Sequence, residues 1–144
     1  MDARRFAMIM GIVFVLVGIL AFIPGVTQPD PSNAPPLSVH GPGHGYLLGL
    51  FHVNVLHNVV HLLFGVLGIL MARDAASAVL YARIVAVAYG LLVILGLIPA
   101  TSTTFGLIPI HGADVVLHLL IAAAAAYFGF VHRTDVTPSP AAPV

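Results

Sequence analysis

The chain has 144 residues, 60% of them hydrophobic and only 7% charged, so it is long enough for one domain and has the composition of a membrane protein. Its five basic and five acidic residues balance, which argues against nucleic acid as a partner. Cysteine is absent, which excludes disulfides, thiolate metal ligands and cysteine nucleophiles. Eight histidines among so few charged residues are the unusual feature of this composition.

Four apolar segments approach the roughly 20 residues needed to cross a lipid bilayer, which predicts a multi-pass membrane protein. The expected spans are residues 6–23, 53–71, 79–98 and 110–131. The first apolar run follows two arginines, as in a signal peptide, but it continues to Ile23 without a cleavage site. We therefore expect this first span to be retained.

Proline and glycine content predicts which segments form the loops and the tail. Residues 25–45 are rich in both, which predicts a loop without any regular element, and residues 45–52 lead from it into the second span at the membrane interface. Residues 134–144 contain three prolines and predict a disordered cytoplasmic tail. The predicted organisation is a four-span transmembrane domain over residues 1–133, followed by this tail.

The arginines predict the orientation of the chain. All of them fall on one side of the four-span arrangement, at positions 4, 5, 73, 83 and 133, and the opposite loops contain no basic residue. Because basic loops stay on the cytoplasmic side, both termini are expected in the cytoplasm, with the chain in the inner (plasma) membrane.

An internal repeat suggests how the spans are arranged. Residues 50–63 align without a gap with residues 107–120, and residues 18–24 resemble residues 93–99. The aligned polar pairs are His61 with His118, His57 with Asp114, and Asn54 with His111. The predicted fold class is therefore all-α, an integral membrane four-helix bundle built from two tandem helical hairpins around a pseudo-twofold axis along the membrane normal.

The repeated polar residues lie on one face of each even-numbered span. Residues four apart share a helix face, so His57 and His61 point the same way, as do Asp114 and His118. The same stripes continue as Gly65 and Gly68 in span two, and as Ala122 and Ala125 in span four. Small residues let helix backbones approach closely in lipid, so we expect spans two and four to pack face to face.

This convergence predicts a metal site. Two histidines four residues apart are a common helical metal-binding pair. The predicted ligands are His57, His61, Asp114 and His118, with Asn54, Asn58 and His111 around them. Three imidazoles and a carboxylate suit zinc, iron, copper or manganese. Haem fits less well, because two histidines of one helix cannot occupy both axial positions, although His61 and His118 could.

The same residues also allow other interpretations. A hydrogen-bond network could hold two helices together, although an aspartate near the bilayer centre costs at least about 2.5–3.5 kcal/mol. Asp114 lies near the start of its span, where it could be partly hydrated or interact with the helix dipole. The histidines of the outer loops, His40, His44 and His52, are expected to be solvated, with transient metal capture as an alternative.

Three classes of function are compatible with these patterns. The first is a metal- or cofactor-binding protein, in which a metal-activated water could hydrolyse a lipid or peptide bond. The second is a non-enzymatic accessory subunit of a larger membrane complex. The third is a small transporter or proton relay, which would need to form a homo-oligomer. These patterns do not decide whether the chain is an enzyme.

Two signatures resemble a known family. Residues 53–65 contain His57-Asn58-x-x-His61, and Asp114-x-x-x-His118 follows in the fourth span. Together they resemble a family of small four-span bacterial membrane proteins classified only as a domain of unknown function. The resemblance covers the four spans and implies their fold and topology, but no activity. The family's usual residue at the position of His52 is proline, as Pro109 is in the second copy, so the resemblance implies no role for His52.

Overall fold

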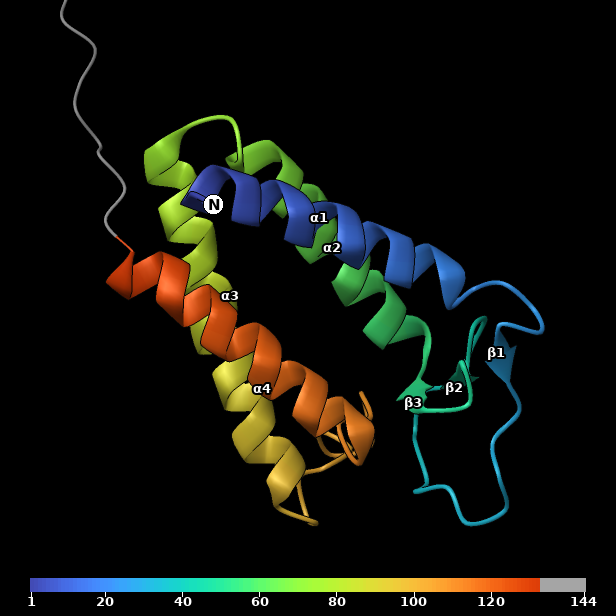
Figure 1. Cartoon of the computed structure of the whole chain (residues 1–144). Helices are drawn as coiled ribbons and strands as arrows, with labels where there is room; N and C mark the ends of the chain where they lie inside the picture. Colours follow the sequence, from blue (N-terminus) through green and yellow to red (C-terminus); the bar gives the residue numbers. More distant parts are fainter. Residues whose placement is uncertain (133–144) are drawn as a thin grey trace, which may run out of the picture.

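The computed structural model describes residues 1–132, so the tail expected at 134–144 lies outside the described residues. Its elements are α1 (Ala3–Leu20), β1 (Thr27–Gln28), β2 (Gly45–Leu47), β3 (Phe51–Val53), α2 (Val55–Met71), α3 (Ala75–Leu97), α4 (Ala113–Ala126) and the π-helix η1 (Tyr127–Val131) that continues α4. Figure 1 shows the helices as a bundle, with the strands beyond the ends of α1 and α2. The predicted all-α membrane bundle is confirmed, with a small sheet added to it.

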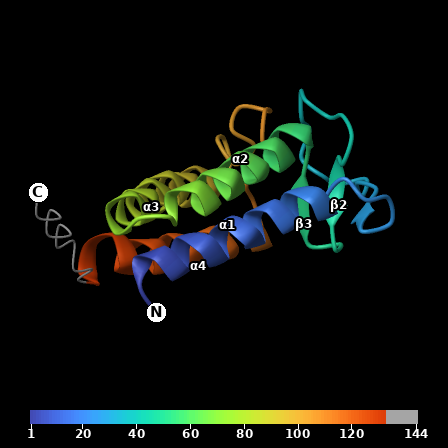
Figure 2. The same cartoon turned by 90° about the horizontal axis from the view of Figure 1, so that it is seen from above.

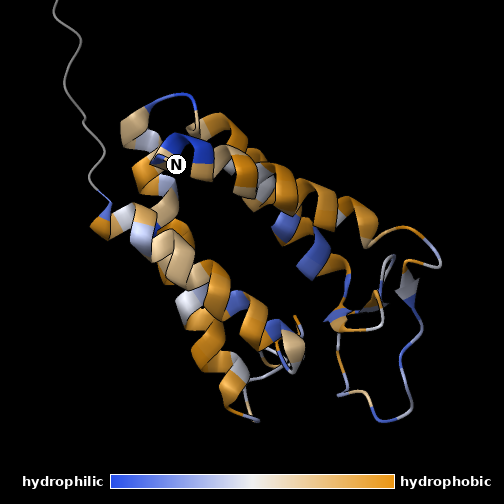
Figure 3. Cartoon of the chain, viewed as in Figure 1, coloured by the Kyte–Doolittle hydropathy of each residue, from blue (hydrophilic) through white to orange (hydrophobic). Residues whose placement is uncertain are grey.

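Three helical segments of the described chain are long and apolar enough to cross a membrane: Ala3–Leu20, Ala75–Leu97 and Ala113–Val131. Helix α2 is also apolar but has only 17 residues, or ~26 Å, against a hydrocarbon core of about 30 Å. The extended strand β3 precedes α2 and continues the chain beyond the start of this helix. Figure 3 shows hydrophobic residues along all the helices, and hydrophilic residues of α2 and α4 near their strand-side ends.

Polar side chains mark the starts of three helices. The carboxylate of Asp2 accepts a hydrogen bond from the backbone N–H of Arg5, and that of Asp74 accepts one from Ser77. The side-chain oxygen of Asn54 accepts the N–H of His57 at 3.0 Å. Such caps satisfy N–H groups that have no partner within the helix. The cap at Asn54 therefore determines where α2 begins, and with it the face on which its histidines lie.

The closest helix packing is within the hairpins α1–α2 and α3–α4. A Cβ atom at Gly65 would lie 2.8 Å from the carbonyl oxygen of Gly11, and one at Gly68 would lie 2.9 Å from that of Ala7. The glycine stripe of α2 thus packs against α1, and the expected close packing of spans two and four through their small residues is wrong. Figure 1 shows the two hairpins as separate pairs, and Figure 2 shows the same bundle from above.

Aromatic rings explain why α2 and α4 stay apart. Phe14 stacks on Tyr89 with ring centroids 5.3 Å apart, and both residues are buried. Phe14 also stacks on His61. On the other side, Tyr89 contacts His118 edge to face, with ring centroids 4.8 Å apart. Because these rings fill the space between the hairpins, α2 and α4 meet through side chains and not through their backbones.

The loop between α1 and α2 contains a sheet, which corrects the expectation of no regular element in residues 25–45. Strands β1, β2 and β3 pair antiparallel in that order. Gly45 makes the first pairing possible, because its φ of 139° is disfavoured for other residues and a Cβ atom there would collide with the carbonyl oxygen of Gln28. The strands have only two or three residues each, so they carry almost no periodic signal in the sequence.

Candidate metal centre

Three histidines from two helices converge in the strand-side half of the bundle. His57 and His61 come from the first two turns of α2, and His118 comes from the second turn of α4. One nitrogen of each ring can be chosen so that all three lie within 4.8 Å of one another. The three residues are 4%, 7% and 2% exposed, so no bulk water surrounds them.

Ring packing holds these imidazoles in place. The rings of His57 and His61 are 4.7 Å apart, and those of His57 and His118 are 6.1 Å apart. His61 lies flat against Phe14 at 5.5 Å with an angle of 9° between the planes, and Tyr89 meets His118 edge-on. Each helix therefore presents its histidines toward the other in a restricted orientation.

Asp114 lies beside His118 and outside the group of three. Its Oδ2 atom is 3.3 Å from Nδ1 of His118, one helical turn later, and the residue is 3% exposed. A carboxylate next to one ring nitrogen is the usual companion of a metal-binding histidine, because it orients the ring and makes the other nitrogen a better ligand. The position of Asp114 suits this orienting role as well as it suits direct ligation.

Several polar atoms of the cluster have no hydrogen-bond partner among residues 1–132. They are Nδ1 of His57, His61 and His118, and Oδ2 of Asp114. Buried polar groups in folded proteins are nearly always satisfied, and leaving one unsatisfied costs on the order of 1–3 kcal/mol. A cation bound through Nδ1 of His57 and His61 would account for two of these atoms, whereas Nδ1 of His118 and Oδ2 of Asp114 lie 3.3 Å from each other. Nitrogens at about 2.0–2.1 Å from one tetrahedral zinc ion lie roughly 3.4 Å apart, so from separations of up to 4.8 Å the rings would have to move closer to one another.

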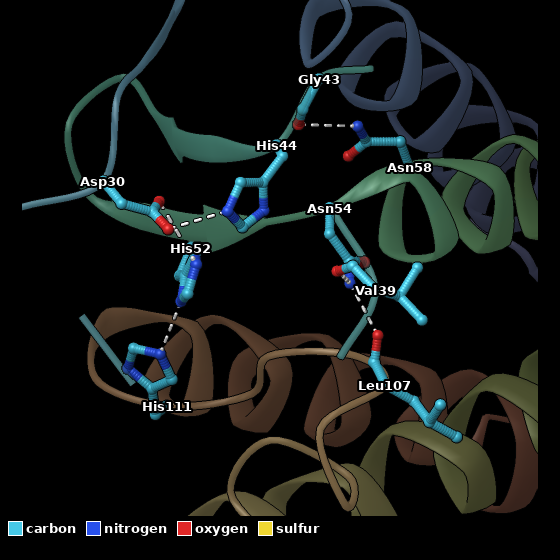
Figure 4. A network of polar contacts seen from close by, with 9 residues as sticks. All are labelled: Asp30, Val39, Gly43, His44, His52, Asn54, Asn58, Leu107 and His111. Atoms are coloured by element: carbon cyan, nitrogen blue, oxygen red, sulfur yellow. Dashed lines mark hydrogen bonds and ion pairs between the residues drawn. The ribbon is translucent and has the colours of Figure 1, made fainter. Parts of the chain in front are cut away.

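The residues expected around the ligands connect the helices to the outer loops. Asn54 donates to the carbonyl oxygens of Val39 and Leu107 at 2.8 and 2.6 Å, which joins the loops of both hairpins at the start of α2. Asn58 donates to Gly43 at 3.1 Å. His111 contacts His52 through ring nitrogens 3.0 Å apart. Figure 4 shows these contacts.

His52 is buried, which corrects the expectation that it is solvated. It is 2% exposed, and its ring stacks on Tyr46 with centroids 4.7 Å apart. Burial lowers the pKa of His52 to about 4, so its imidazole is neutral at pH 7. His44 is partly buried and lies 2.8 Å from Asp30, whereas His40 is exposed, as expected. Asp30 lies next to His44 and His52 because of the strand pairing, which could not be predicted before the sheet was known.

A pocket of about 100 Å³ adjoins the histidine cluster. It lies between the strand-side ends of α1 and α4, below β2 and β3. Its polar walls are His57, His61 and Asp114, and its apolar walls are Val17, Leu20, Leu47, Leu48, Phe51, Val53 and Leu117. The cluster is therefore reached through a mainly hydrocarbon-lined space.

Comparison with known proteins identifies the family and no function. Residues 4–131 match the family model described as "Domain of unknown function (DUF4383)". A search of curated proteins gave no match, and neither did a search of solved structures. Because the match covers most of the chain, including all four helices, the chain belongs to this family.

Proposed function

We propose that this member of the DUF4383 family binds a transition-metal ion between α2 and α4, with His57, His61 and His118 as its imidazole ligands. The observation that carries the proposal is the buried set of three ring nitrogens within 4.8 Å of one another. Asp114 completes the site, either as a fourth ligand or by holding the ring of His118. In both roles its negative charge offsets that of the cation, in surroundings where a charge alone would be costly.

The unsatisfied atoms favour a metal over a purely structural network. A network that served only to join helices would pair its buried donors and acceptors. Here Nδ1 of His57 and Nδ1 of His61 lack a partner among the described residues, and the other two unsatisfied atoms, Nδ1 of His118 and Oδ2 of Asp114, lie 3.3 Å from each other. A bound cation supplies the missing partner for imidazole lone pairs. This is the reason to rank a metal above an accessory subunit held together by hydrogen bonds.

The donor set limits the identity of the ion. Neutral imidazoles suit zinc, copper, iron and, with a carboxylate, manganese. Haem is disfavoured, because the adjoining pocket of about 100 Å³ is much smaller than the 300–1,000 Å³ of usual ligand sites. Phe14 and Tyr89 fill the rest of the space between the rings of the two helices.

Metal content of the purified protein tests the proposal. After chelator-free purification in detergent, elemental analysis is expected to find bound transition metal, and His118→Ala and His61→Phe are expected to lose the metal of this site. His61→Phe retains the flat contact with Phe14, so its loss of metal cannot be ascribed to lost packing. The matched control is His132→Gln, because His132 follows η1 at the end of this helix that is farthest from the cluster. Metal content in both cluster variants equal to that of the control would refute the proposal.

The pocket favours a second candidate function, binding of a membrane-soluble molecule against the metal. Its walls are hydrocarbon except where they meet His57, His61 and Asp114, so an acyl chain or a similar apolar group fits its chemistry. Native mass spectrometry of the protein would detect a retained lipid. Leu117→Phe is expected to fill the pocket and to displace that lipid while leaving the metal in place. A lipid retained equally by this variant would exclude the pocket as its site.

Hydrogen bonds of Arg4 and Arg83 support the proposed orientation, with both termini in the cytoplasm. Arg4 donates to the carbonyl oxygen of Ala72, and Arg83 donates to that of Gly129. Arg4 lies in the first turn of α1 and Gly129 lies in η1, at the end of the bundle opposite the strands, where Figures 1 and 2 show the start of α1. Under the positive-inside rule this end faces the cytoplasm, and the histidine cluster then lies in the outer half of the bundle.

A further inference from the structure

A second group of metal-binding side chains lies on the outer sheet. Nε2 of His44 is 2.8 Å from Oδ2 of Asp30, and Nε2 of His52 is 3.5 Å from Oδ1 of the same carboxylate. One ligand atom from each residue can be chosen so that all lie within 4.8 Å of one another. Figure 4 shows the three side chains turned toward one another from separate segments of the loop.

Strand register explains why these residues meet. Gln28 pairs with Tyr46, and Asp30 and His44 each lie two residues beyond this pair, just outside β1 and β2. Tyr46 also pairs with His52 on the other side. Residues two apart in a strand share a face of the sheet, so Asp30, His44 and His52 project from the same face. The sheet therefore brings His52 in β3 close to Asp30 and His44, which lie in the loop next to β1 and β2.

Contacts with both hairpins hold the group in place. Gly43, immediately before His44, accepts a hydrogen bond from Asn58 of α2. The other ring nitrogen of His52, Nδ1, lies 3.0 Å from Nε2 of His111, just before α4. Tyr46 stacks on the ring of His52. Such support on several sides is what a metal ligand needs to keep its orientation.

Two ring nitrogens of the group, Nδ1 of His44 and Nε2 of His52, lack a hydrogen-bond partner within residues 1–132. Nε2 of His52 is fully buried and has no hydrogen bond within residues 1–132, although the carboxylate of Asp30 lies 3.5 Å away. When Nδ1 of His52 donates its proton to His111, Nε2 carries a lone pair that faces a carboxylate oxygen. A lone pair and a carboxylate repel each other unless a cation lies between them. In this tautomer of His52 a cation between the two atoms would satisfy both, whereas in the other tautomer the Nε2–H of His52 points at Asp30 directly.

We propose that Asp30, His44 and His52 form a second transition-metal site, at the outer end of the bundle and separate from the histidine cluster between α2 and α4. Two imidazoles and one carboxylate are a known ligand set for zinc and for iron(II), with positions left over for water. The side chains of Asp30 and His44 are 28% and 18% exposed, so a hydrated cation reaches the site from solvent. The proposal does not depend on the inner site.

Titration of the full-length protein with zinc tests this site. The protein is purified in detergent, stripped with a chelator, dialysed and titrated by calorimetry. Asp30→Asn and His44→Gln are each expected to lower the zinc stoichiometry by one equivalent, or to weaken that equivalent by roughly tenfold to 100-fold. Both side chains are partly exposed, so the variants are expected to fold, which melting in detergent verifies. His132→Gln is the matched control and is expected to leave the titration unchanged.

The His61→Phe background separates the two sites. This variant lacks a ligand of the inner cluster but keeps the outer group, so one equivalent of zinc is expected to remain. Adding Asp30→Asn to it is expected to remove that equivalent. The second site is refuted when Asp30→Asn and His44→Gln bind zinc as the wild type does. Failure of the inner site has a different signature, because His61→Phe would then leave the stoichiometry unchanged.

Discussion

Replacement of Gly65 by alanine is expected to force α1 and α2 apart. A Cβ atom at this position would lie 2.6 Å from Cγ2 of Val15, 2.7 Å from the nitrogen of Val15 and 2.8 Å from the oxygen of Gly11. Ordinary contacts of this kind begin at 3.4 Å, so the helices would have to separate by about 0.6–0.8 Å. Two of the three atoms belong to the backbone and cannot turn away.

The separation costs packing along the whole hairpin. A gap of roughly 0.5–1 Å already removes a quarter to a half of the dispersion energy of each contact it opens. Overpacking of this kind typically costs about 1–3 kcal/mol, against a gain of at most about 1 kcal/mol from the better helix propensity of alanine. We therefore expect Gly65→Ala to lower the free energy of unfolding, and Gly11→Ala to do so from the opposite side of the same contact.

Gly90→Ala is the matched control. Gly90 also lies inside a helix, but a Cβ atom there would meet no atom of the described chain within 4 Å. This variant is expected to be neutral or to gain up to about 1 kcal/mol from helix propensity. The assay is reversible unfolding in mixed detergent, followed by far-ultraviolet circular dichroism. If Gly65→Ala proves as stable as Gly90→Ala, the close packing of α1 and α2 is refuted.

Three further predictions use other parts of the chain. Cysteines introduced at Asn33 and Thr103 should react with an impermeant thiol reagent on intact cells, and one at Ala76 should not; labelling at Ala76 alone would reverse the orientation. Burial lowers the pKa of His52 from 6.5 to about 4, so the unfolded chain binds more protons between these values, and stability present above pH 6.5 should fall as the pH approaches 4, by up to roughly 3 kcal/mol. Melting in detergent at a series of pH values measures this loss, and His52→Phe should reduce it but not abolish it, because His57, His61 and His118 are buried as well. A pH profile that His52→Phe leaves unchanged would contradict the buried neutral ring. Asp114→Asn should weaken metal binding at the inner cluster by about tenfold to 100-fold, and unchanged affinity in a calorimetric titration would exclude any role for this carboxylate.

The convergence of the inner histidines could be predicted, because it depends on local periodicity and on a repeat. His57 and His61 are four residues apart, so any helix places them on one face. The aligned copy predicted that His118 would face them, and its nitrogen does lie within 4.8 Å of theirs. The caps at Asn54 and Asp74 are likewise local signals, since each polar residue bonds an N–H three positions later.

Local patterns could not predict which helix packs against each helix face. The stripe of Gly65 and Gly68 predicts a close approach, but it does not say of which helix, and α1 takes that place. Bulky rings of Phe14 and Tyr89 then keep α4 away from α2, which depends on packing across three helices. The burial of His52 was missed because it requires the pairing of strands with only two or three residues each.

X-ray absorption spectroscopy of the Asp30→Asn protein tests the central claim most directly. This variant lacks a ligand of the outer group, so zinc retained at one equivalent reports on the inner cluster alone. We expect three imidazole nitrogens at about 2.0–2.1 Å, with the multiple-scattering features of histidine, and two after His118→Ala is added. A zinc shell of oxygen atoms without histidine scattering, or a spectrum unaffected by His118→Ala, would contradict the assignment of His57, His61 and His118 as ligands of one ion.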